Sequence, residues 1–145
     1  MFVYRICRAP YTALDGEGAK VYGGRWNSPG KPALYTASHL SLAALELLVH
    51  LDFDNLPLDL VWLKIEIPGT VSLLKFPDPV APNEREAALY GDAWLTAKRS
   101  LGLIVPSAVL SVELNVIINP LHSEASHLRI VKTASFEFDD RLFKR

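Results

Sequence analysis

An apolar helical stretch that contains a single acidic residue constrains this chain most. Between residues 39 and 51 the apolar side chains recur at the spacing of one buried helix face, so we predict a helix there with Ser38 as its N-cap. Further leucine and valine side chains make most of the remaining helix surface apolar. The pattern therefore predicts a helix that is buried on nearly all sides.

Glu46 lies inside this stretch, with Leu42 and Val49 on its own helix face. Because an unpaired buried carboxylate is strongly destabilising, we expect Glu46 to face a cleft, a cationic partner, or both. The same pattern is compatible with a structural salt bridge or a small exposed stripe. The functional interpretation is a cleft carboxylate.

The rest of the chain favours an α+β fold in one domain, residues 1–145. Half of the 145 residues are apolar, which is enough for one real core. A second helical region is predicted at about 83–99, with a break at Gly91. Strands outnumber helices and do not alternate with them, which disfavours a doubly wound sheet. Residues 15–18 are predicted as a turn or loop, and strands at 2–7, 33–36, 61–67, 103–105, 108–110, 115–118 and 128–138.

The segment around Arg25 is rich in turn residues. Gly23 and Gly24 precede the arginine, and residues 28–30 read Ser-Pro-Gly, a strong turn signal. With the strand at 33–36, this predicts a β-hairpin that places Arg25 and Tyr35 on neighbouring strands.

Three further side chains allow either a structural or a functional interpretation. The guanidinium of Arg25 suits a carboxylate or a phosphate, or it forms an ordinary surface salt bridge. The ring of Tyr35 packs in the core or borders a cleft. Ser107, which follows Pro106, binds a ligand, polarises Glu46 or caps a turn.

Charge and motif content exclude several classes of function. A formal net charge of −1 gives no bulk electrostatic case for direct binding of nucleic acid or of an anionic membrane. One cysteine allows no internal disulfide, and no signal peptide or membrane span is visible, so we expect a cytoplasmic protein. No nucleotide-binding glycine motif and no zinc-ligand spacing are present, so no metal site is expected.

Several ordered blocks of the sequence resemble the RES domain, and together they cover nearly the whole chain. The family takes its name from Arg, Glu and Ser, which here correspond to Arg25, Glu46 and Ser107. The blocks are Gly23–Gly30, Ala33–Thr36, Leu42–Glu46, Val105–Val109, Asn115–Pro120 with His122, and Phe138–Leu142.

The resemblance implies a fold similar to the ADP-ribosyltransferases and an activity on NAD+, which would be a substrate with no separate cofactor. It implies that the protein is a toxin, which arrests growth by depleting NAD+. It also implies a partner, an Xre-type helix-turn-helix antitoxin that binds the toxin and blocks its site.

Residue roles follow from the same resemblance. Glu46 would stabilise the charge that develops on the nicotinamide ribose, Arg25 would hold the pyrophosphate or lie near that ribose, and Tyr35 would stack on nicotinamide. Ser107 would orient Glu46 or a ribose hydroxyl. The remaining expected contacts with NAD+ come from Trp26 and Asn27.

Three alternatives stay open at this point. At least some family members transfer ADP-ribose onto a protein rather than onto water. A ribonuclease-like toxin using His, Arg and Glu is a second alternative, although the near-zero net charge disfavours it. The third is an interaction module without catalytic activity. Homodimerisation through an apolar helix face is also left open.

Overall fold

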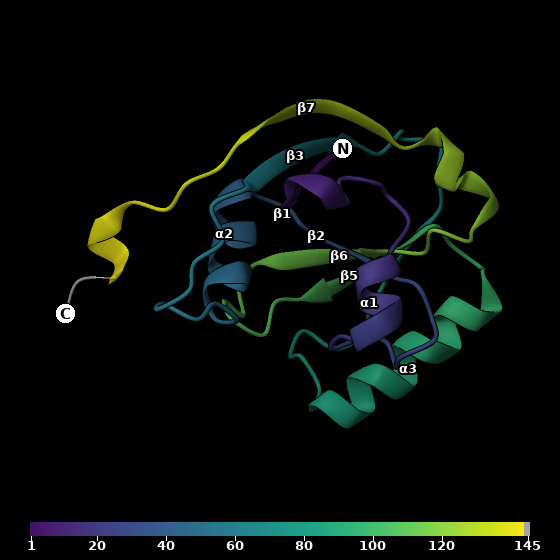
Figure 1. Cartoon of the computed structure of the whole chain (residues 1–145). Helices are drawn as coiled ribbons and strands as arrows, with labels where there is room; N and C mark the ends of the chain where they lie inside the picture. Colours follow the sequence, from purple (N-terminus) through teal and green to yellow (C-terminus); the bar gives the residue numbers. More distant parts are fainter. Residues whose placement is uncertain (144–145) are drawn as a thin grey trace.

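A seven-stranded mixed sheet carries the fold in the computed structural model, which describes residues 1–143 (Figure 1). The strand order is β4-β5-β6-β2-β1-β3-β7, and β4 with β5 is the one parallel pair in the described sheet. Because the helices are not interleaved with parallel strands, the α+β prediction is confirmed. The strands are β1 (Phe2–Arg8), β2 (Leu34–Ala37), β3 (Leu60–Glu66), β4 (Leu73–Lys75), β5 (Gly102–Pro106), β6 (Leu114–Ile118) and β7 (Arg129–Ser135).

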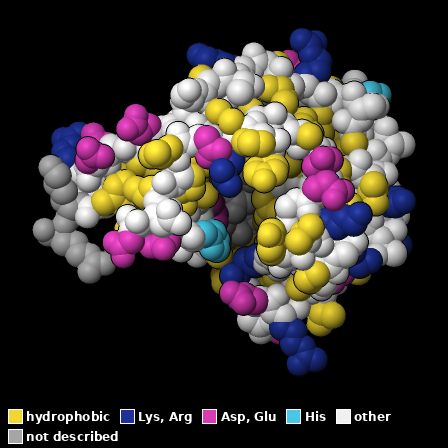
Figure 2. Space-filling view, in the orientation of Figure 1, with side chains coloured by type: hydrophobic (Ala, Val, Ile, Leu, Met, Phe, Trp, Pro, Cys, Tyr) yellow, Lys and Arg dark blue, Asp and Glu magenta, His cyan; other side chains and the backbone are white. Residues whose placement is uncertain are grey.

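Three α-helices lie over one face of the described sheet, in two separate groups (Figure 1). The first group is α2 (Leu40–Leu48), which packs on Ala37 of β2 and on partly buried side chains of β1. The second is α1 (Glu17–Tyr22) with α3 (Glu84–Ala97), which cover β5 and β6. The space-filling view shows the surface hollowed between these two groups, with charged side chains of both signs around the hollow (Figure 2).

The opposite face of the sheet holds the larger apolar cluster. Val3, Leu34, Leu63 and Ile118 are completely buried there. Loops and the short 3-10 helix η2 (Ser123–His127) contribute the partly buried side chains that cover it. The hollow therefore opens on the face away from this main core. No helix among residues 1–143 is long and apolar enough to cross a membrane.

The predicted helix at 39–51 is present, but two details of the prediction are wrong. Its N-cap is His39, which has an extended backbone, rather than Ser38, which donates its N–H to the carbonyl of Leu114. The helix is also only half-buried, since Leu45 and Val49 are exposed. A helix laid on a sheet buries one stripe, and the apolar outer stripe faces the C-terminal segment of the chain instead.

The predicted hairpin around Arg25 is wrong. Residues 23–27 form no strand; Gly24 and Asn27 close a tight turn through a single bridge. Gly23 has a φ of 73°, a conformation that glycine adopts without strain. Tyr35 lies on β2 as predicted, but β2 pairs with β1 and β6, which are distant in sequence.

Three smaller predictions also differ from the structure. The loop predicted at 15–18 contains the start of α1, because Asp15 Oδ1 accepts the backbone N–H of Glu17 and Gly16 adopts a φ of 67°. Helix α3 continues through Gly91 without a break. Residues 108–110 form a turn instead of a strand.

Candidate active site

Glu46 projects from α2 toward two side chains, one directly after β5 and one on β6, the strand that pairs with β5. Its Oε1 accepts a hydrogen bond from Ser107 Oγ at 2.6 Å and another from Asn115 Nδ2 at 2.7 Å. Ser107 directly follows β5, and Asn115 belongs to β6. Within residues 1–143 no protein group donates to Oε2 and no cation pairs with the carboxylate. Of the expected environments, a cationic partner is therefore not found among the described residues.

The hydroxyl of Ser107 has a fixed direction. Its oxygen accepts the backbone N–H groups of Val109 and Leu110, both at 3.1 Å, so the hydroxyl proton is free to go to Glu46. These backbone contacts also explain why residues 108–110 turn instead of continuing as a strand. Two of the roles considered from sequence, capping a turn and polarising Glu46, are therefore combined in one side chain.

Tyr35 is held by its hydroxyl within the turn that precedes β2. The hydroxyl accepts the backbone N–H of Trp26 at 2.8 Å and donates to Asn27 Oδ1 at 2.6 Å. Burial is the main reason why the pKa of Tyr35 lies well above its ordinary value near 10. The hydroxyl is thus neutral and fully engaged, which leaves the ring as the part of Tyr35 that can meet a ligand.

The sequence predicted contacts with NAD+ from Trp26 and Asn27, but the structure uses both side chains in packing. Both side chains are almost completely buried, and Asn27 Nδ2 donates to the carbonyls of Ala19 and Lys31. Their polar and apolar surfaces are used in packing, so the expectation that they bind NAD+ directly is not supported. They instead build the turn that carries Arg25.

Arg25 is half-buried and has no acidic partner among the described residues. Its Nη2 donates to the carbonyl of Pro82 at 2.9 Å, whereas its Nε is buried without a hydrogen-bond partner. A guanidinium with unused donors suits an anionic ligand such as a phosphate. The structure does not bring Arg25 into contact with Glu46.

The register of the sheet places Asn115, which binds Glu46, on the same surface as Tyr35, which binds the Arg25 turn. Ala37 of β2 pairs with Asn115 of β6, and Tyr35 pairs with Ile117. Alternate residues of a strand share a face, and Asn115 lies two residues before Ile117, the partner of Tyr35. Tyr35 and Asn115 therefore lie on the same side of the sheet. The Glu46 contacts and the ring of Tyr35, whose hydroxyl binds the turn that carries Arg25, therefore lie on the same face of the sheet, the face on which the helices pack.

Three buried side-chain polar atoms have no hydrogen-bond partner in the described chain, and they are Arg5 Nε, Arg25 Nε and Asn115 Oδ1. Arg5 alternates with Val3 and Cys7 along β1, so its side chain leaves the sheet on the main-core face, opposite Tyr35 and Asn115. Arg5 lies on β1 and donates from Nη1 to the carbonyl of Tyr35 at 3.4 Å, where β1 and β2 share only the Tyr4–Ala37 pair. Such atoms are uncommon in native proteins and call for an explanation.

Sequence reasoning did not single out Arg5 or Asn115 as site residues. The available signal for Arg5 was a charged side chain in the apolar strand at 2–7. For Asn115 it was an amide at the start of the apolar run at 115–118.

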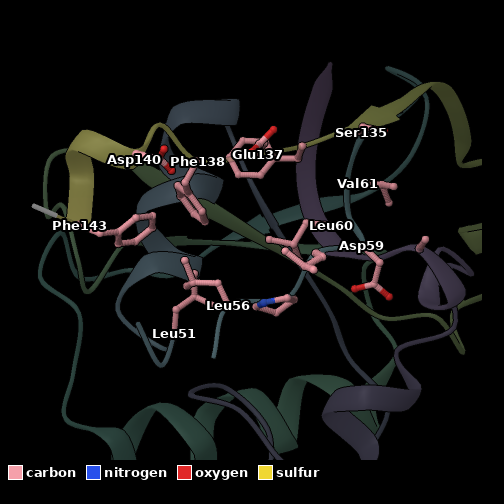
Figure 3. A pocket seen from close by; sticks show the side chains of 14 residues that line it. Leu51, Leu56, Asp59, Leu60, Val61, Ser135, Glu137, Phe138, Asp140 and Phe143 are labelled. Carbon is pink, nitrogen blue, oxygen red and sulfur yellow. The ribbon is translucent and has the colours of Figure 1, made fainter. Parts of the chain in front are cut away.

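Two pockets lie elsewhere, along the C-terminal segment. One, of about 420 Å³, has Phe138 and Phe143 facing Leu51 and Leu56 (Figure 3). The other, of about 380 Å³, lies against the outer face of α2. Neither is lined by Glu46, Arg25 or Tyr35. We place the candidate site by its polar geometry, because catalysis requires positioned polar groups that bond to one another.

Comparison with known proteins assigns the family. The sequence profile of the RES domain matches residues 2–139. This chain belongs to the RES domain family. A protein named Toxin Res from Photorhabdus laumondii is 40% identical to this RES protein, over 99% of this chain and 98% of the relative. A Sphingobium protein named Prs ADP-ribosylating toxin is 34% identical, over 91% of this chain and 88% of the relative.

The fold comparison agrees with the family. The structure of this RES protein resembles a chain in the crystal structure of the M. tuberculosis MbcT–MbcA toxin–antitoxin complex, with a TM-score of 0.74. The match covers 93% of this chain and 83% of that chain at 21% identity. The expected family and its fold are therefore confirmed, and the near full-length relatives named Toxin Res place the chain among the RES toxins.

Proposed function

We propose that this RES toxin hydrolyses NAD+ at the bond between nicotinamide and ribose. The observation that carries the proposal is the Glu46 carboxylate, which is fixed through Oε1 and keeps Oε2 free of protein donors within residues 1–143. The candidate site also contains Arg25, a guanidinium with unused donors and no acidic partner in the described chain.

The chemistry of NAD+ fits this set of groups. Nicotinamide leaves as a neutral molecule with the electron pair of the broken C–N bond, so the step needs no general acid, unlike ordinary glycoside hydrolysis. The ribose carbon becomes cation-like, and a nearby carboxylate stabilises that charge. Water then adds its oxygen to this carbon and releases one proton. The products are nicotinamide, ADP-ribose and a proton.

Arg25 and Tyr35 bind the substrate in this proposal. Arg25 holds the pyrophosphate or lies near the nicotinamide ribose, because its planar donors match phosphate oxygens. Tyr35 offers its ring to nicotinamide, since its hydroxyl is occupied by Trp26 and Asn27. NAD+ is the substrate, and no further cofactor is part of the proposal.

The partner in this proposal is an antitoxin of the Xre type, which blocks the hollow and keeps the toxin inactive. The solved structure with the similar fold comes from a toxin–antitoxin complex, which supports a partner of this kind. Expression of the chain without its antitoxin is then expected to lower cellular NAD+ and arrest growth.

Transfer of ADP-ribose onto a protein is the second candidate. The name of the Sphingobium relative, an ADP-ribosylating toxin, favours it. Bond breaking would be the same, and a protein nucleophile would replace water at the ribose carbon. Mass spectrometry of proteins incubated with isotopically labelled NAD+ separates the two, because only transfer leaves the label on protein.

The deciding experiment measures nicotinamide release by the purified chain and by Glu46→Gln. Glutamine keeps an oxygen for both donors but removes the charge, so we expect kcat to fall by roughly 10²–10³-fold while the thermal midpoint stays close to that of the native chain. Glu137→Gln, an exposed substitution on the C-terminal segment, is the matched control and should keep full activity. Full NAD+ turnover by a folded Glu46→Gln protein would refute the proposal.

A further inference from the structure

Asn115 makes one strong contact and leaves one buried atom unsatisfied. Its Nδ2 donates to the Glu46 carboxylate at 2.7 Å, and its Oδ1 is buried without a partner. The amide cannot be turned round, because Oδ1 would then face a carboxylate oxygen, and neither atom is a donor. The unsatisfied oxygen is therefore the direct consequence of the donor to Glu46.

The surroundings of Asn115 do not otherwise require an amide. Its partners across the sheet are Ala37 on β2 and Val105 on β5, both buried and apolar. An apolar side chain would fit this strand position and would leave no polar atom unsatisfied. Asn115 thus gives up stability for its contact with Glu46, as is common at sites where function and stability conflict.

The two donors act on Glu46 in a defined way. Ser107 and Asn115 bond the same oxygen, and they belong to neighbouring, hydrogen-bonded parts of the sheet. Because both donors come from a rigid sheet, they fix the direction of the second oxygen, Oε2.

We infer that Asn115 is a positioning residue, which together with Ser107 holds the Glu46 carboxylate and directs Oε2 toward the reacting ribose. This inference rests on the proposed hydrolysis of NAD+, since that reaction requires a charged carboxylate beside a cation-like carbon. Asn115 itself does not touch the reacting atoms in this assignment.

Asn115→Leu tests the inference, with Asn119→Leu as the matched control. Asn119 is also a buried asparagine at the end of β6, but both ends of its amide are bonded, to the Leu95 carbonyl and the Leu121 N–H. We expect Asn115→Leu to keep or raise the thermal midpoint, and Asn119→Leu to lower it by about 4–8 °C. A fall for Asn115→Leu as large as for Asn119→Leu would indicate a structural role and overturn the inference.

Kinetics separate positioning from binding. Asn115→Leu should lower kcat by about 10–100-fold with little change in KM, because a hydrogen bond to a charged group is lost while substrate contacts remain. An unchanged kcat, or a loss of activity that appears in KM instead of kcat, would overturn the inference.

A measurement without substrate keeps the inference separate from the proposed function. Carbon NMR of the labelled Glu46 carboxyl in the free protein reports the loss of the hydrogen bond from Asn115, so its chemical shift should change in Asn115→Leu and stay the same in Asn119→Leu. A chemical shift that does not change in Asn115→Leu overturns the positioning role, whatever the turnover. If the native chain releases no nicotinamide at all, hydrolysis of NAD+ fails as the function, and the NMR comparison alone decides the role of Asn115.

Discussion

The turn of residues 23–30 and the surroundings of Glu46 use their polar atoms differently. The amide of Asn27 and the Tyr35 hydroxyl that binds it are both bonded within the protein, and Arg25 Nε is the buried side-chain atom of the turn without a partner in the described chain. Around Glu46, by contrast, Asn115 Oδ1 has no partner, and Oε2 receives no donor from residues 1–143. The bonded pair of Tyr35 and Asn27 makes a rigid support, whereas the atoms around Glu46 leave hydrogen-bonding capacity unused.

Helix α3 explains why the turn is so well fixed. Asp92 accepts the backbone N–H of Ser28 at 2.8 Å and its hydroxyl at 2.6 Å. One residue earlier, Gly91 lies directly against the carbonyl of Trp26. Substitutions in the turn or beneath it should therefore reduce stability, and substitutions around Glu46 should reduce turnover.

The largest effect is expected from Gly91→Ala. A Cβ at this position would overlap the backbone carbonyl oxygen of Trp26, which cannot move without opening the turn. We expect a loss of about 3 kcal/mol in the free energy of unfolding, measured by urea titration. Gly18→Ala is the control, because nothing lies within 4 Å of a Cβ there. It should raise stability by about 0.5 kcal/mol. Equal stability of the two variants would show that α3 does not fix the turn.

A smaller effect is expected from Tyr35→Phe. Loss of the hydroxyl leaves the Trp26 N–H and Asn27 Oδ1 without their partner, which should cost about 2 kcal/mol of unfolding free energy. The ring remains, so nicotinamide release per folded molecule should stay within about threefold of the native value. The opposite result, full stability with strongly reduced turnover, would place the hydroxyl in the chemistry and break the comparison.

The smallest effect concerns alkaline pH. Burial raises the pKa of Tyr35 in the folded chain, whereas the unfolded chain ionises near pH 10. The contribution of the neutral hydroxyl is therefore complete below pH 10 and is lost as pH rises above it, by up to about 1 kcal/mol per pH unit. Unfolding titrations between pH 9 and 11 should show a steeper loss for the native chain than for Tyr35→Phe. Parallel curves would mean that this hydroxyl is not protected from ionisation.

Local patterns in the sequence predicted much of the fold. The apolar spacing of residues 39–51 identified α2, and alternation along residues 61–67 identified β3. Those patterns arise from residues that are close together in the chain, so they can be recognised without knowledge of the tertiary structure. The hairpin failed because a strand next to a turn does not specify its partner, and β2 pairs with strands from both ends of the chain. Helix α1 was missed because it contains Gly18 and lies between two further glycines, Gly16 and Gly23, which hide the helical pattern.

By itself the sequence determined the α+β class, the helix that carries Glu46, and the family to which the chain belongs. The limit of that information is seen in the hydrogen-bonded cluster of Glu46, Ser107 and Asn115. Ser107 lies 61 residues from Glu46, and Asn115 lies 69 residues from it. Only the tertiary structure decided that both donate to one carboxylate oxygen, because such contacts depend on strand register and helix placement, and local chain preferences do not set either.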